Sequence, residues 1–197
     1  MSNKKTKLFM KQNELIVQLF KNAESAVKVF NTLERRLNAL GFEVPECYDH
    51  TRKGGFMGVG FTKNDLLLKQ INEIVQKKDP QFGTKSEKYE EYATGKYFVL
   101  INQMVMLSEQ RQFVPIFKDG SKGTPVSVAG GVAFQWNNKY VFTSFSGRSS
   151  KADQAILMLS AYKSGIIDST GIRVFYEITK NPFLESGIFG AIISEMK

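Results

Sequence analysis

Histidine, cysteine and tryptophan are nearly absent from this chain, since each occurs once in 197 residues. With Cys47 as the single cysteine, no disulfide can form within the chain, which favours a reducing compartment. A zinc site of the Cys/His type is excluded, because four such ligands are not available. Cys47 and the single histidine, His50, lie so close together in a loop-like segment that a catalytic pair would need an unusual geometry.

Long apolar runs are absent as well. No stretch approaches the ~18 apolar residues that a membrane-spanning helix needs. Lys, Asn, Glu and Gln interrupt residues 1–20, so the sequence predicts no signal peptide at its start. We therefore expect an intracellular, cytoplasmic protein that has no membrane partner.

Positive charge and aromatic residues are plentiful by comparison. The chain holds 27 Lys and Arg against 19 Asp and Glu, a formal net charge of +8, and 12% of its residues are aromatic. The aromatic content argues against disorder over most of the length. The excess of positive charge favours a polyanionic partner, of which we expect nucleic acid. The alternative is a soluble basic protein with no such partner.

The N-terminal region predicts one long helix over residues 13–40. Apolar residues recur there at spacings of three and four, and Gly41 follows at the position where helices end. This apolar stripe includes Ile16, Leu19, Phe20, Val27, Phe30 and Leu37. It can brace a sheet or pair with a second chain as a homodimer or with another protein. Bracing is favoured because the stripe also contains alanine and phenylalanine besides leucine.

The remaining pattern predicts helices and strands in alternation. Helices are expected over residues 64–78, 150–165 and 181–197, and strands over 96–107, 112–117 and 171–179. Two further strands, 132–136 and 139–145, flank Asn137-Asn138 and are typical of a hairpin. The glycine-rich segment 54–61 fits either a strand or a loop.

These elements predict an α/β domain, with α+β as the alternative, that contains a mixed sheet, an antiparallel hairpin, packed helices and a long N-terminal helix. We expect a single domain over 1–197. Its residues 1–80 would form a helical part with the glycine-rich segment, and 95–197 would form the core that contains the sheet.

Residues 113–178 resemble the first part of the ribonuclease H-like fold. A strand runs into Asp119-Gly120-Ser121, a glycine-led hairpin follows, and a helix with an acidic residue, Asp153, comes next. The expected strand 171–179 then carries Glu177. The family usually has Glu at the helix position and Asp at the strand position, so the two acids differ from its pattern.

The resemblance implies a metal-dependent nuclease, or a degenerate relative of one, in which Asp119, Asp153 and Glu177 are catalytic and hold Mg²⁺ or Mn²⁺. If the protein is not such a nuclease, we expect it to bind no cofactor. The alternative reading makes Asp119 a turn residue, Asp153 a helix N-terminal charge and Glu177 a solvent-facing residue.

A second group of residues is basic and aromatic, and it surrounds the hairpin. Aromatic faces stack unpaired bases, while lysine and arginine contact phosphates. The candidate nucleic-acid-binding residues are Lys118, Lys122, Trp136, Lys139, Tyr140, Arg148 and Lys151. The leading hypothesis is a non-enzymatic protein that binds single-stranded DNA or RNA. The nuclease is the first alternative, and the second is a protein–protein inhibitor or adaptor that acts through the N-terminal helix.

Overall fold

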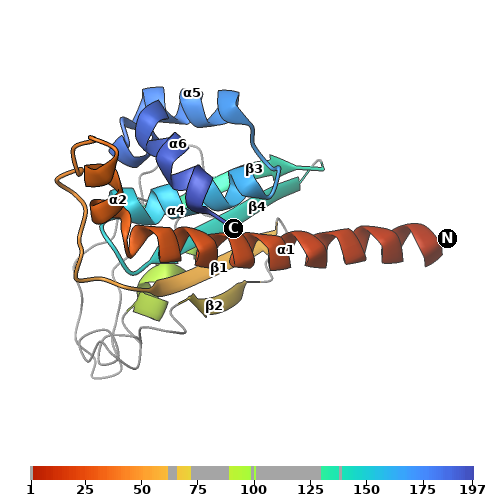
Figure 1. The fold of residues 1–197 in the computed structure, drawn as a ribbon. Helices are drawn as coiled ribbons and strands as arrows, with labels where there is room; N and C mark the ends of the chain where they lie inside the picture. Colours follow the sequence, from red (N-terminus) through yellow and green to blue (C-terminus); the bar gives the residue numbers. More distant parts are fainter. Residues whose placement is uncertain (1, 62–65, 72–88, 99, 101–129, 138) are drawn as a thin grey trace, which may run out of the picture.

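The computed structural model combines one β-sheet with helices on both of its faces (Figure 1). It describes residues 2–61, 66–71, 89–98, 100, 130–137 and 139–197. The expected class of helices packed on a sheet, with a long N-terminal helix, is confirmed. The strand expected over 112–117 lies outside the described residues.

The N-terminal helix runs further than expected and is broken once. Helix α1 (Ser2–Phe30) is followed by the short helix α2 (Leu33–Ala39), and Gly41 then takes a positive φ of 76°. Leu19, Phe30 and Leu37 are fully buried, and they share one core with residues of the sheet. These residues of the apolar stripe therefore pack in the chain's own core, and binding of a second chain through the N-terminal helix stays a prediction.

The sheet is built from both halves of the chain. Its described strands are β1 (Gly55–Phe61), β2 (Leu67–Ile71), β3 (Gly131–Trp136) and β4 (Lys139–Ser146). Their order is β2-β1-β4-β3, and each neighbouring pair is antiparallel. The sheet is thus not confined to residues 95–197, because β1 and β2 come from the N-terminal part. The glycine-rich segment is a buried strand at its centre.

The hairpin is confirmed, with Trp136 opposite Lys139 at its tip. Asn137 has a φ of 46°, a left-handed conformation that asparagine tolerates better than most residues. Asn138 lies outside the described residues.

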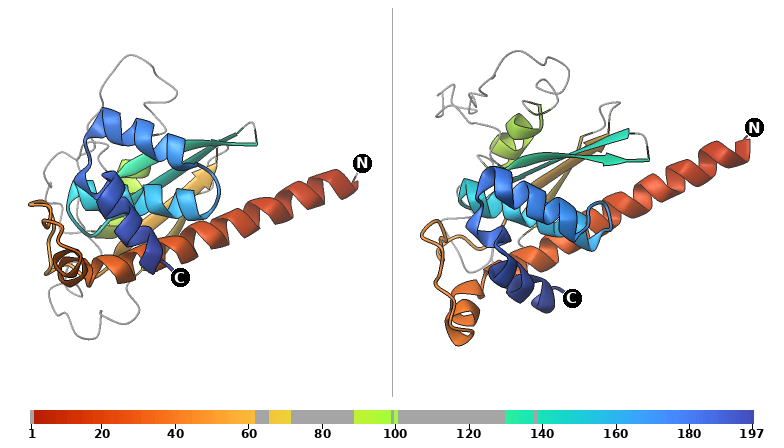
Figure 2. Two further views of the ribbon diagram at one scale, coloured as in Figure 1. Left: turned by 45° about the horizontal axis from the view of Figure 1, so that its top comes forward. Right: turned by 90° about the horizontal axis from the view of Figure 1, so that it is seen from above.

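Each face of the sheet is covered by helices (Figure 2). Val141 and Phe145 point into the main core, where α1 and α4 (Ser150–Lys163) pack. Phe142 points to the other face and contacts Tyr97 from the helical residues 89–98. That helix packs so closely that a Cβ added at Gly60 would lie 1.8 Å from the Tyr97 hydroxyl oxygen.

Two hydrogen bonds fix α1 against α4. The Ser160 hydroxyl donates to the Leu19 carbonyl at 2.6 Å, and the Asn22 amide donates to the Ser164 hydroxyl at 2.9 Å. The expected helix over 150–165 is therefore confirmed as α4, with Ser149 as its N-cap. The last predicted helix is divided, since the 3-10 helix η1 (Pro182–Leu184) precedes α6 (Ser186–Glu195).

Three predictions of local structure are wrong. Residues 171–179 belong to helix α5 (Ser169–Thr179) and not to a strand, because Asp168 caps a helix there by accepting a bond from the Gly171 amide. Residues 67–71 form strand β2 inside the expected helix 64–78, since pairing with β1 outweighs local helix propensity. Residues 96–98 are helical and not extended. With α5 in place of a strand, every pairing among the described strands is antiparallel.

Candidate nucleic-acid interface

The aromatic residues of the hairpin do not form one surface. Trp136 lies on the core side of the sheet and packs against Phe61, with ring centroids 5.9 Å apart. Tyr140 lies on the opposite side, beside Phe142 at 6.3 Å, and its exposed fraction is 42%. The two side chains lie on opposite faces of the sheet, so they do not form one stacking platform together.

Arg148 is a buried residue of the core and not a phosphate ligand. Its exposed fraction is 5%, its guanidinium donates to the Asn31 side-chain oxygen, and it lies 5.7 Å from the centroid of the Phe30 ring. Burial lowers the pKa of Arg148 to about 10, since desolvation disfavours the cation. The assignment of Arg148 to nucleic-acid binding is therefore wrong.

The other lysines predicted around the hairpin are divided by the fold. Lys151 donates to the Thr179 carbonyl at 2.7 Å, so it joins the start of α4 to the end of α5. Lys139 is half-buried at the hairpin tip. Lys118 and Lys122 lie outside the described residues. The hairpin therefore presents Lys139 and Tyr140 to solvent and no continuous basic face among its described residues.

The acid predicted on α4 has a structural partner. Asp153 is buried, and its carboxylate accepts bonds from the Lys96 ammonium at 2.9 Å and from the Arg148 amide at 2.8 Å. The Lys96 ammonium also donates to the Phe145 carbonyl at 2.9 Å. Burial raises the pKa of Asp153, while the charge of Lys96 opposes the shift. These bonds tie residues 89–98, the end of β4 and the start of α4 together.

The second acid, Glu177, lies in a different environment. It is exposed on α5 and pairs with Lys180 at 2.5 Å, and the hydrogen bond from Lys180 lowers the pKa of Glu177. One carboxylate is thus buried in an ion pair while the other faces solvent, and the structure does not bring Asp153 and Glu177 together. Asp119 lies outside the described residues. Within the described ranges, no three His, Cys, Asp or Glu side chains are grouped so that they could hold a metal ion.

Cys47 is half-buried, and burial raises the pKa of its thiol. The raised pKa disfavours the thiolate, which is the nucleophilic form of cysteine. His50, three residues further on, is exposed.

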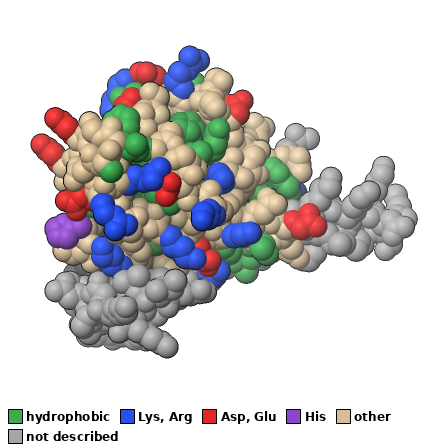
Figure 3. Space-filling view, viewed as in Figure 1, with side chains coloured by type: hydrophobic (Ala, Val, Ile, Leu, Met, Phe, Trp, Pro, Cys, Tyr) green, Lys and Arg blue, Asp and Glu red, His purple; other side chains and the backbone are tan. Residues whose placement is uncertain are grey.

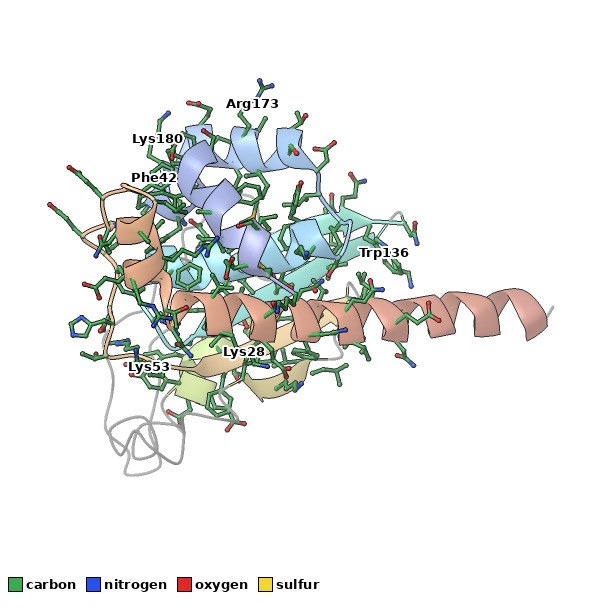
Figure 4. All side chains as sticks on the ribbon, in the orientation of Figure 1. Lys28, Phe42, Lys53, Trp136, Arg173 and Lys180 are labelled. Atoms are coloured by element: carbon green, nitrogen blue, oxygen red, sulfur yellow. The ribbon has the colours of Figure 1, made fainter. Side chains whose placement is uncertain are left out.

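Basic side chains gather on another surface, along α1 (Figure 3). Lys21, Lys28 and Arg35 are exposed, and none of the ion pairs formed within the described part of the chain includes them. Figure 4 labels Lys28 on this helix and shows Arg173 on α5 and Lys180 at the end of α5, away from it. We call Lys21 and Lys28 the α1 basic pair.

Geometry explains why the α1 basic pair faces solvent. Seven residues are almost two full helical turns, so the two lysines lie on the same side, about 10 Å apart along the axis. The negative charge of the neighbouring Glu24 is balanced by Lys69 of β2, with which it forms an ion pair. The prediction from the sequence missed this pair, although the spacing of the two lysines relative to the apolar stripe is a signal for it.

Comparison with known proteins adds no family to this description, since no family model, curated protein or solved structure matches the chain. None of the helices in the described ranges combines the length and the apolarity that a bilayer crossing requires.

Proposed function

We propose that this protein binds nucleic acid without catalysing a reaction on it, and that the contact is made by the exposed basic side of α1. The observation that carries the proposal is the α1 basic pair. Lys21 and Lys28 are exposed on one side of a helix whose other side is anchored in the core.

The anchoring matters for affinity. Because α1 packs on the sheet and is bonded to α4 through Ser160 and Asn22, the positions of Lys21 and Lys28 are set before any ligand arrives. A pre-organised backbone loses less conformational entropy on binding than a free segment does. Arg35 on α2 adds a third exposed cation beyond Lys28.

The contact is to phosphates and not to bases. Binding of single strands by stacking needs exposed aromatic rings. Among the residues whose side chains the structure describes, the exposed aromatic ones are Phe42, Phe98 and Tyr140, and they come from separate elements. Lysine contacts to phosphate release counterions and carry little sequence information. The expected behaviour is therefore sequence-tolerant binding that weakens steeply as salt rises.

The test measures binding of short labelled DNA to the full chain by fluorescence anisotropy over a range of salt concentrations. Lys21→Ala/Lys28→Ala should reduce the slope of log K against log salt by about two units, since each lost phosphate contact accounts for about one. The matched control is Arg173→Ala/Lys180→Ala, which removes two exposed positive charges on α5 and at its end and should leave the slope unchanged.

Arg148→Met provides a second comparison. Because Arg148 is buried, its replacement should leave the salt slope at the parent value. If the parent protein binds no DNA or RNA at low salt, the proposed function is wrong. If the Lys21/Lys28 and Arg173/Lys180 variants lose the same amount of slope, the binding surface lies elsewhere.

A further inference from the structure

Two neutral polar side chains lie on the same side of α1 as the α1 basic pair. Gln18 precedes Lys21 by three residues, and Ser25 precedes Lys28 by three. Because positions three and four residues apart are neighbours on a helix, 18, 21, 25 and 28 form one continuous line. Gln18 is exposed and Ser25 is half-buried. A neutral hydrogen-bond donor followed by a lysine thus occurs twice along this side of α1.

Neither neutral side chain is used to hold the fold together. Within the described part of the chain, no hydrogen bond joins the Gln18 amide or the Ser25 hydroxyl to another group, whereas Asn22 of the same helix donates to Ser164. A serine within a helix often bonds to a carbonyl of the preceding turn, and Ser25 does not. Both groups can therefore donate to a ligand without breaking a bond of the fold.

The direction of side chains on a helix brings each lysine toward the neutral donor that precedes it. The Cα–Cβ bonds tilt toward the helix N-terminus, so a long side chain covers the turn before its own residue. This tilt directs Lys28 over Ser25 and Lys21 over Gln18. One phosphate group has several acceptor oxygens, so it can accept from an ammonium and from a neutral donor together.

The carboxylates nearest to this line do not block it. Glu24 is held in its ion pair with Lys69. Glu14 is exposed one turn before Gln18, where it would repel a phosphate, so the surface begins at Gln18.

We propose that Gln18–Lys21 and Ser25–Lys28 are two phosphate-binding units, and that each holds one phosphate of the same nucleic-acid strand. The proposal rests on the proposed function and adds Gln18 and Ser25 to its binding residues. The two units lie about 10 Å apart on one anchored helix. This arrangement favours a ligand with several phosphates over one with a single phosphate, because the second contact is made within the same complex.

The lysines and the neutral donors contribute to binding in ways that an experiment separates. A lysine that contacts a phosphate releases condensed counterions, so its loss lowers the slope of log K against log salt. A neutral donor releases no counterion, so its loss lowers the affinity by the same factor at every salt concentration. The loss of one such hydrogen bond weakens binding about five-fold.

The test uses the full chain and the same short labelled DNA in anisotropy titrations at low and at high salt. Gln18→Ala/Ser25→Ala should weaken binding about 25-fold at both salt concentrations and keep the slope of the parent. Alanine preserves the helix in this variant. Ser25→Thr retains a hydroxyl and should bind within about two-fold of the parent, which separates the loss of the donor from a change of shape.

The matched control is Gln135→Ala/Ser169→Ala, which removes the same two side-chain types at exposed positions of β3 and α5 and should leave the affinity unchanged. An equal loss in the control, or a lower slope in Gln18→Ala/Ser25→Ala, would overturn the inference. If the parent binds neither DNA nor RNA at low salt, the proposed function itself fails. If the slope depends on Lys21 and Lys28 but the variant without Gln18 and Ser25 binds like the parent, only this inference fails.

Discussion

The buried ion pair between Lys96 and Asp153 is the interaction that most directly tests how the two faces of the sheet are joined. Lys96 comes from the helical residues 89–98 on one side, and Asp153 lies in the first turn of α4. Their side chains are 6% and 2% exposed, and the Nζ–Oδ2 distance is 2.9 Å. We consider the variants Lys96→Met and Asp153→Leu, alone and combined.

Each single variant should lower the free energy of unfolding by about 3–5 kcal/mol, because the remaining charge stays buried without its partner. In Asp153→Leu the ammonium retains only the Phe145 carbonyl among its two acceptors. The double variant removes both charges, and apolar replacement of a buried pair is often neutral. It still leaves the Arg148 amide without its carboxylate acceptor, which costs about 1–3 kcal/mol.

The double variant should therefore be more stable than either single variant, with a coupling energy of at least about 3 kcal/mol. Equilibrium unfolding in urea, followed by far-UV circular dichroism and by the fluorescence of Trp136, supplies the four free energies. An unchanged m-value establishes that the change is one of stability. Single-variant costs that simply add, with a coupling energy below about 0.5 kcal/mol, would refute the pair as described here.

Gly60→Ala should destabilise the protein severely, because the new Cβ would lie 1.8 Å from the Tyr97 hydroxyl oxygen. Gly190→Ala should instead stabilise α6 by about 0.5–1 kcal/mol, because a Cβ at that position would have no atom within 4 Å. Urea unfolding of both variants checks this, and equal effects would contradict the close packing of residues 89–98. Partial burial raises the pKa of Glu185, but hydrogen bonds from Ser186, from Ile188 and from Gly187 outweigh it and lower that pKa below 4.5. A lowered folded-state pKa stabilises the fold above 4.5 and loses this effect as the pH falls through the folded value. The Tm difference between the parent and Glu185→Gln should thus shrink on acidification, and a difference that grows there would contradict the cap.

Local patterns in the sequence were enough for several elements. The spacing of Leu19, Phe30 and Leu37 predicted a helix with one buried side, because a period of 3.6 residues repeats within the helix itself. The hairpin around Asn137 and the helix that begins at Ser150 were predicted for the same kind of reason. In each case the forces involve residues that are near one another in the chain.

Other elements were decided by partners distant in the sequence. Residues 67–71 have a helical composition, but they pair with β1 and form the outermost of the described strands on that side. The aromatic and β-branched residues around Phe175 suggested a strand, yet the cap at Asp168 and the apolar spacing of Ile172, Phe175 and Tyr176 suit a helix that packs on η1. A short apolar run is compatible with both the helical period of 3.6 residues and the strand period of two. Which of the two structures forms depends on the surface that covers the run.

The candidate sites show the same division between local and long-range information. The sequence by itself determined the net charge of +8 and the lysine spacing along α1, because both depend only on residue type and order. Only the tertiary structure decided which charges reach solvent: Arg148 and Asp153 became buried, while Lys21 and Lys28 stayed exposed. The physical reason is that desolvation and ion pairing depend on neighbours such as Lys96 and Asn31, which the fold brings together across more than 50 and more than 100 residues of chain.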